Sequence, residues 1–176
     1  MPDHSHPATT PIRVLGIDTS LRSTGLGVVE RQGSGLRAVA YRAVSVPQKQ
    51  PHSECLRRIH EAIHAMIEEA RPDAASIEGI FHCRNVRTAV TLGQARGVAI
   101  AACAARAVPV FEYSPRRMKQ SVCGSGAAPK EQVARMVVKM LNLSGDPGSD
   151  EADALALAIC HLHSMTSIQA LAPKAI

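Results

Sequence analysis

The 176-residue sequence has few aromatic residues: it contains two Tyr, two Phe and no Trp. The core must therefore be built from Val, Ile, Leu and Ala. Long apolar runs are also missing, because even the alanine-rich stretch 98–105 ends at Arg106. A membrane span needs about 18 consecutive apolar residues, so a membrane-spanning protein is excluded.

Paired cysteines are missing as well. The five cysteines stand far apart, with no Cys-x-x-Cys pair and an odd total. Neither a disulfide framework nor a zinc site follows from this pattern. We expect reduced thiols and a cytoplasmic location.

Acidic residues are scarce between residues 79 and 135, where nine Lys or Arg stand against two Glu, Glu112 and Glu131. The whole chain carries a formal net charge of +5, and fifteen of its twenty basic residues are Arg. The planar guanidinium fork suits phosphate oxygens, so this asymmetric field favours nucleic acid as a partner. A basic surface that only aids solubility is the alternative.

The hydrophobic pattern predicts a sheet that forms early in the chain and is then covered by helices. Apolar runs predict three antiparallel strands followed by two shorter parallel ones, over residues 12–18, 24–30, 37–46, 74–78 and 108–113. Periods of three and four residues predict helices over 56–70, 88–106, from 129 and over 149–165, with a basic helical turn opening at Pro115. Ser149 is expected to cap the last helix.

This order of elements predicts an α/β fold, a mixed five-stranded sheet flanked by helices, as in the ribonuclease H-like folds. We expect one nuclease domain over residues 12–165. Residues 1–11 and 166–176 are expected to be a disordered N-terminal tail and a flexible C-terminal tail. On the helix over 88–106, small residues recur every four positions and would form either a dimer interface or a surface packed on the sheet.

Four carboxylates come from three separate segments that could meet. Asp18 and Glu78 directly follow predicted apolar strands, and Asp150 and Asp153 share a face in the first turn of the last helix. Clustered acids repel one another unless a cation holds them, and ligation by oxygen alone favours Mg²⁺ or Mn²⁺. Each acid taken singly also fits a helix-start or salt-bridge role.

A series of motifs resembles a known family. The segments are Gly16-Ile17-Asp18, Thr24 to Val29, Ile77-Glu78 with Phe81 and Asn85, Leu92 to Ala99, Val110 to Tyr113, Lys119-Gln120, and Asp150 to Ala156. They resemble, in order and over about residues 13–163, the RuvC family of bacterial crossover-junction (Holliday-junction) endodeoxyribonucleases. The Leu-Gly-Gln-Ala-Arg-Gly block together with Asp-x-x-Asp-Ala-Leu-Ala makes the resemblance highly specific.

The resemblance implies an endonuclease that cuts four-way DNA junctions symmetrically in recombination and repair, leaving 5′-phosphate and 3′-hydroxyl ends. It places the catalytic acids at Asp18, Glu78, Asp150 and Asp153, and it places lysines near the cut phosphate at Lys119 and Lys130. Two Mg²⁺ ions, replaceable by Mn²⁺, would activate water and stabilise the leaving oxygen. Thr19-Ser20 stands where the family usually has Pro-Gly, which changes the turn and keeps the ligand.

The resemblance also implies partners. It puts Phe81 at the junction, stacked on an unpaired base, although a buried Phe is the commoner outcome. Two-fold cleavage implies a homodimer, and the family implies the RuvA and RuvB branch-migration complex. Weaker candidates for contact with the DNA backbone are Arg84, Arg87, Arg116 and Arg117.

Two other functions remain open at this stage. A Gly-Ile-Asp strand with a Thr-Gly-rich hairpin also resembles the first phosphate loop of actin-like ATPases and sugar kinases, but the chain is short and lacks the second loop. A junction-binding protein without catalysis would be expected to have lost an acid, and all four are present.

Overall fold

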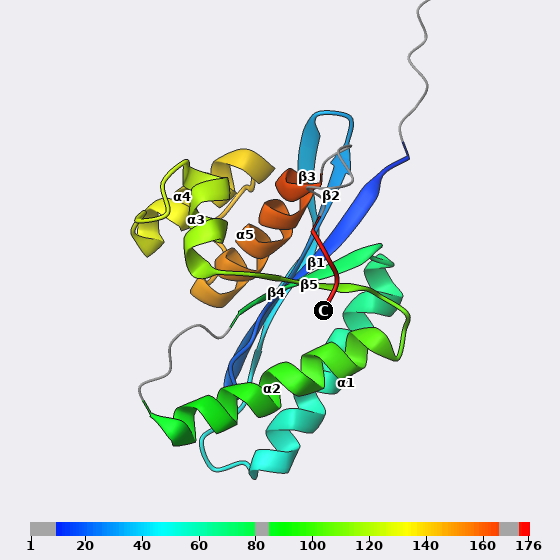
Figure 1. The fold of residues 1–176 in the computed structure, drawn as a ribbon, viewed down its shortest axis with the longest axis vertical. Coiled ribbons are helices and arrows are strands. Elements are labelled where there is room, and N and C mark those ends of the chain that lie inside the picture. The colour runs from blue at the N-terminus through cyan, green and yellow to red at the C-terminus, as the bar shows by residue number, and fades with distance from the viewer. Residues whose placement is uncertain (1–9, 80–84, 166–172) are drawn as a thin grey trace, which may run out of the picture.

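The computed structural model of the chain describes residues 10–79, 85–165 and 173–176. Five strands form one sheet in the order β3-β2-β1-β4-β5, in which β1 to β3 are antiparallel and β4 and β5 run parallel to β1 (Figure 1). Their bounds are β1 Ile12–Asp18, β2 Ser23–Gln32, β3 Gly35–Ser45, β4 Ala74–Glu78 and β5 Val110–Tyr113. The prediction of a mixed five-stranded sheet is confirmed.

Helices cover both faces of the sheet (Figure 1). On one face lie α1 (His52–Ala70) and α2 (Val86–Ala104), and on the other lie α3 (Pro115–Cys123), α4 (Lys130–Leu141) and α5 (Ser149–Ser164). Two separate apolar clusters, built almost entirely from aliphatic side chains, fill the two layers. None of the described helices combines the length and apolar character needed to cross a membrane.

The two-residue period of the strands decides which side chains face α5. In β1, Leu15 and Ile17 belong to the cluster under α1 and α2, whereas Val14 belongs to the cluster under α5. Because successive side chains alternate between the two faces, Asp18 points to the α5 side. In β4 the Ser76 hydroxyl donates to the Leu157 carbonyl oxygen of α5 (2.9 Å), so Glu78, two residues later, points to the same side.

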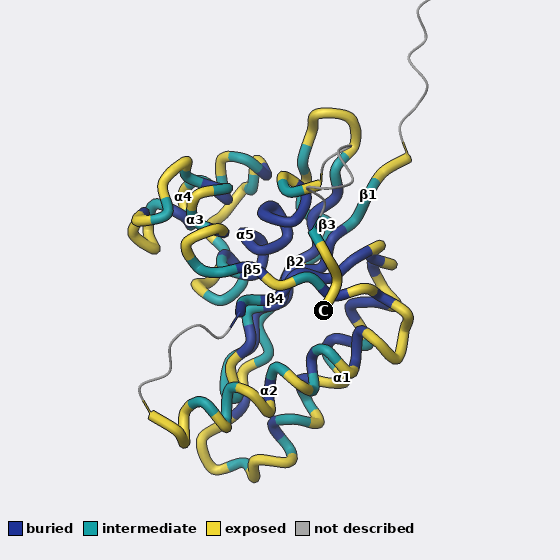
Figure 2. Tube along the Cα trace, viewed as in Figure 1, coloured by how far each residue is buried: buried dark blue, intermediate teal, exposed yellow. Residues whose placement is uncertain are grey.

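Glycines in β1 and β2 let α5 lie directly on the sheet. A Cβ on Gly16 would collide with the carbonyl oxygen of Ala154, and one on Gly25 would collide with the carbonyl oxygen of Asp150. Figure 2 shows that α5 is buried along most of its length. The close approach brings the first turn of α5 beside the end of β1, where Asp18 pairs with Gly25 across the strands.

Several helix ends differ from the sequence prediction for local reasons. The second helix begins at Val86, two residues earlier than predicted, because the Asn85 side chain caps it by accepting from the Arg87 amide (2.8 Å). The predicted basic turn at Pro115 is a nine-residue helix that Ser114 caps. The predicted cap at Ser149 is wrong: Ser149 is the first residue of α5, its N-cap is Gly148, and no side chain caps it.

The strip of small residues on α2 does not pack on the sheet. Gly93, Gly97 and Ala101 are exposed, and the helix instead turns Ala95, Ala99, Ala102 and Cys103 to the core. The sheet-packing interpretation is therefore wrong, and the strip is free for another contact.

The last four described residues return to the sheet. The Ile176 amide donates to the Val110 carbonyl oxygen (2.9 Å), which places residues 173–176 beside β5.

The close contact between Gly16 and α5 predicts that an added methyl group destabilises the fold more there than at a glycine with open space around it. Gly16→Ala should destabilise the fold by at least about 1–3 kcal/mol, because the added methyl group displaces the α5 backbone. Gly145→Ala is the matched control, because a Cβ there meets nothing within 4 Å. Urea denaturation monitored by circular dichroism measures both, and equal stabilities of the two variants would contradict the packing argument.

Candidate active site

A cavity of about 220 Å³ opens where the ends of several elements meet. Three carboxylates line it: Asp18 at the end of β1, Glu78 at the end of β4 and Asp153 on α5. The same cavity is lined by Lys119 of α3 and Lys130 of α4, with Pro115, Met118 and Val133 as its apolar wall. Five of the six predicted catalytic residues thus come together from five elements.

The environment of Asp18 disfavours its negative charge. Burial, followed by the charges of Asp153, Glu78 and Asp150, raises the pKa of its carboxyl to about 7, although Lys130 acts in the opposite direction. Burial and the Asp153 charge likewise raise the pKa of Glu78, against the opposing effect of Lys130 and Lys119. A nearby cation would stabilise the ionised forms of these carboxylates, because it would offset their mutual repulsion.

Asp150 and Asp153 have different partners although they lie only three residues apart near the start of α5. The Lys130 ammonium lies 2.6 Å from a carboxylate oxygen of Asp153, and this contact raises the pKa of Lys130. Asp150 accepts a hydrogen bond from the Ser23 hydroxyl of β2 and does not line the cavity. Its charge still reaches Asp18.

Within residues 10–79, 85–165 and 173–176, no three His, Cys, Asp or Glu side chains are already arranged as a metal site. Two of the four acids have other partners, since Lys130 contacts Asp153 and Ser23 donates to Asp150. The donor set nevertheless fits a hard divalent cation, because it consists of carboxylate oxygens that face one cavity and repel one another.

Two contacts at the site were missed by sequence reasoning. Arg96 of α2 donates to the Glu78 main-chain carbonyl oxygen (3.0 Å) and forms an ion pair with Glu112, so it fixes the end of β4. Arg96 stands in the Leu-Gly-Gln-Ala-Arg-Gly block, which was the available signal. The contact between Ser23 and Asp150 spans more than a hundred residues and had no local signal.

Three of the predicted DNA-contacting residues, Arg87, Arg116 and Arg117, are described by the structure and do not line the cavity. Arg87 lines a hollow with Ser20 and Thr88, and Arg117 lines another with Ser121 and His163. Both arginines are exposed, as is Arg116. Phe81 and Arg84 lie outside the described residues, so their roles stay predictions.

Comparison with known proteins decides the family. A family model described as crossover junction endodeoxyribonuclease RuvC matches residues 14–161. The chain belongs to the RuvC family. Its RuvC relatives include one from Chloroflexus aggregans, 45% identical over 90% of this chain and 97% of that protein, and one from Paraburkholderia phytofirmans, 45% identical over 91% and 88%.

Solved structures agree with this RuvC assignment. The T. thermophilus RuvC in complex with Holliday junction substrate is similar at a TM-score of 0.85 and 34% identity, covering 94% of this chain and 99% of that one. The yeast mitochondrial Holliday junction resolvase shares the fold at a TM-score of 0.62 with 14% identity. The predicted ribonuclease H-like fold is confirmed.

The raised pKa of Asp18 predicts how its removal affects stability. The folded protein holds a proton on this carboxyl up to about pH 7, against about 3.8 ordinarily, so Asp18 reduces stability as the pH rises through that range. Without divalent ions at pH 8, Asp18→Asn should raise Tm by at least about 2–4 °C, the shift that 1 kcal/mol gives in such a domain. The gain should be smaller at pH 5.5.

Asp146→Asn is the control for this measurement, because Asp146 is an exposed acid in the loop before α5. Its Tm should match that of the unsubstituted protein at both pH values. A lower Tm for Asp18→Asn at pH 8 would show that the carboxylate stabilises the fold and would contradict the electrostatic account.

Proposed function

We propose that this chain resolves four-way DNA junctions by divalent-metal-dependent hydrolysis of one phosphodiester bond per active site. The observation that carries the proposal is the gathering of Asp18, Glu78 and Asp153 with Lys119 and Lys130 in one cavity. Membership of the RuvC family and the similarity to a relative solved with Holliday junction substrate support the choice of DNA.

The carboxylates would hold two Mg²⁺ ions, for which Mn²⁺ can substitute. Asp18, whose carboxyl is affected by the charges of the other three acids, would hold the ions together with Glu78, Asp150 and Asp153. When bound, such a pair of ions activates a water molecule and stabilises the leaving 3′ oxygen, so the products carry 5′-phosphate and 3′-hydroxyl ends.

The lysines supply positive charge to the phosphate. Lys119 and Lys130 line the same cavity as the carboxylates, where a phosphate would enter, and Lys130 contacts Asp153. An ammonium group acts there as a point charge against the negative charge that develops during hydrolysis. Met118 and Val133 form the apolar part of the wall beside these charges.

The two alternative functions lose support. Family membership over residues 14–161 argues against a fragment of an actin-like ATPase or sugar kinase. A binding protein without catalysis has no need of carboxylates that raise one another's pKa values in a shared cavity.

Cleavage of a synthetic four-way junction tests the proposal. The protein should cut the junction in Mg²⁺ and not in EDTA, and linear duplex of the same sequence should be cut far less. Asp18→Asn should reduce the cleavage rate by about a hundredfold or more, because metal ions contribute several kcal/mol to such reactions. Gel assays of end-labelled strands measure the rate.

Glu61→Gln is the control, since Glu61 is exposed on α1 and pairs only with Arg57 in the described part of the chain. Its rate should equal that of the unsubstituted protein. Cleavage that persists in EDTA, or that survives Asp18→Asn, would show that the metal scheme is wrong.

We further propose a homodimer built on α2. The strip of small residues is exposed there, and two large apolar side chains beside it, Val86 and Val90, are 80% and 54% exposed. Small residues let a second helix approach closely, and a two-fold dimer offers the two active sites that paired cleavage needs. The RuvA and RuvB branch-migration complex in the cytoplasm is proposed as the wider partner on family grounds alone.

The dimer proposal predicts that Gly97→Glu weakens self-association. A Cβ on Gly97 meets nothing within 4 Å, so the single chain should tolerate the change, whereas a charge between two helices should not be tolerated. Sedimentation velocity should show a shift from dimer to monomer, and Gly145→Glu in an exposed loop serves as the control. A dimer unaffected by Gly97→Glu would place the interface elsewhere.

A further inference from the structure

Of the four predicted acids, Asp150 alone does not line the catalytic cavity. Its point of attachment is nevertheless close to the site, because a Cβ on Gly25 would meet the Asp150 Cβ at 3.1 Å. Gly25 pairs with Asp18 across β2 and β1, and neighbouring strands lie about 4.8 Å apart. The Asp150 side chain therefore starts one strand away from Asp18 and can turn toward it or away from it.

The Ser23 hydroxyl determines the direction that the Asp150 side chain takes. It donates a hydrogen bond to a carboxylate oxygen of Asp150. Ser23 and Gly25 lie two residues apart on the same face of β2, and Gly25 is the residue that pairs with Asp18, the last residue of β1. The carboxylate is thus directed along β2, past the end of β1, and not across to Asp18.

The backbone that carries Ser23 is fixed on both sides, so this hydroxyl cannot follow the carboxylate into the cavity. The buried Thr24 hydroxyl donates to the Ser20 carbonyl oxygen (2.6 Å). The Arg22 guanidinium donates to two carbonyl oxygens of the segment 47–50, at 2.9 and 3.0 Å. For the carboxylate to reach the cavity, its hydrogen bond to Ser23 must therefore break.

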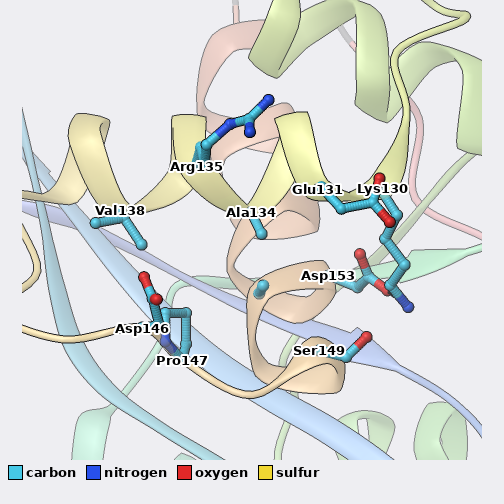
Figure 3. Close-up of a pocket in the computed structure, with 10 residues that line it drawn as sticks. Lys130, Glu131, Ala134, Arg135, Val138, Asp146, Pro147, Ser149 and Asp153 are labelled. Carbon is cyan, nitrogen blue, oxygen red and sulfur yellow. Dashed lines mark ion pairs between the residues drawn. The ribbon is translucent and has the colours of Figure 1, made fainter.

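The contact with Ser23 also keeps two negative charges apart. Among the acids that raise the pKa of Asp18, Asp150 has a smaller effect than Asp153 and Glu78. Asp153 has a different partner, since the Lys130 ammonium lies 2.6 Å from its carboxylate, as Figure 3 shows. Each of the two acids of α5 is thus stabilised by a group that a coordinated cation would have to replace.

We propose that Ser23 is a positioning residue that competes with a divalent cation for Asp150. The inference rests on the proposed metal-dependent cleavage and explains what controls loading of the site. A hydroxyl beside a metal ligand often orients it and strengthens binding. Here the hydrogen bond stabilises the protein only while Asp150 is turned away from the cavity, so it weakens cation binding by the factor by which it stabilises the cation-free fold.

Mn²⁺ titration of the full-length protein by isothermal calorimetry measures this competition. Ser23→Ala should bind Mn²⁺ about tenfold more tightly, because a hydrogen bond to a charged acceptor no longer has to break. Ser23→Thr keeps a hydroxyl and should bind like the unsubstituted protein. Ser45→Ala is the matched control, since Ser45 is exposed on β3 directly opposite Ser23, and its affinity should be unchanged.

Melting temperatures separate this competition from a purely structural role of Ser23. In EDTA, Ser23→Ala should lower Tm by about 2–4 °C, and in saturating Mn²⁺ the difference should disappear, because Asp150 has then left Ser23 in the unsubstituted protein as well. A structural contact would lower Tm equally under both conditions. In an Asp150→Ala background, Ser23→Ala should change neither Tm nor affinity.

Mn²⁺ binding by Ser23→Ala that is equal to or weaker than that of the unsubstituted protein overturns the inference. A loss of Tm that persists in saturating Mn²⁺ does so too. If the unsubstituted protein binds no Mn²⁺ at all, the proposed metal-dependent function fails together with the inference. Mn²⁺ binding that does not respond to Ser23 leaves that function standing, so the two failures are distinguishable.

Discussion

The contact of α5 with the backbone of β1 and β2 is the constraint on which the site depends. Gly16 and Gly25 leave no side chain between helix and sheet, so the α5 backbone fills the space that a Cβ would take. Asp150 and Asp153 are thereby carried to the strand edge where Asp18 ends β1. A site made of residues more than a hundred positions apart follows from the absence of two methyl groups.

This packing disfavours the ionised forms of the acids that it brings together. Carboxylates brought together and partly buried resist ionisation, as the pKa of about 7 for Asp18 shows. Lys130 relieves part of the repulsion through its contact with Asp153, and Ser23 does so for Asp150 through a hydrogen bond. The clustered carboxylates that the proposed function needs therefore lower the stability of the folded protein at this edge of the sheet, and a bound cation would offset that loss.

Sequence reasoning predicted the features that local pattern determines. Short apolar runs ending in an acid identified β1 and β4, and with them the strand ends at which Asp18 and Glu78 stand. Contacts between distant segments were out of reach: Arg96 on the Glu78 carbonyl and Ser23 on Asp150 arise only from tertiary packing. Ser149 was misassigned because capping preferences favour Ser over Gly at the N-cap, whereas the helix begins one residue earlier than expected and has Gly148 as its N-cap.

The ion pair between Lys130 and Asp153 joins an acid of the site to its positive charge. One ammonium group cannot neutralise Asp153 and contact a phosphate equally well, so a cation held by Asp153 would leave Lys130 available to the phosphate. Binding of a cation and binding of a phosphate would then favour each other, because each draws one partner out of the same ion pair.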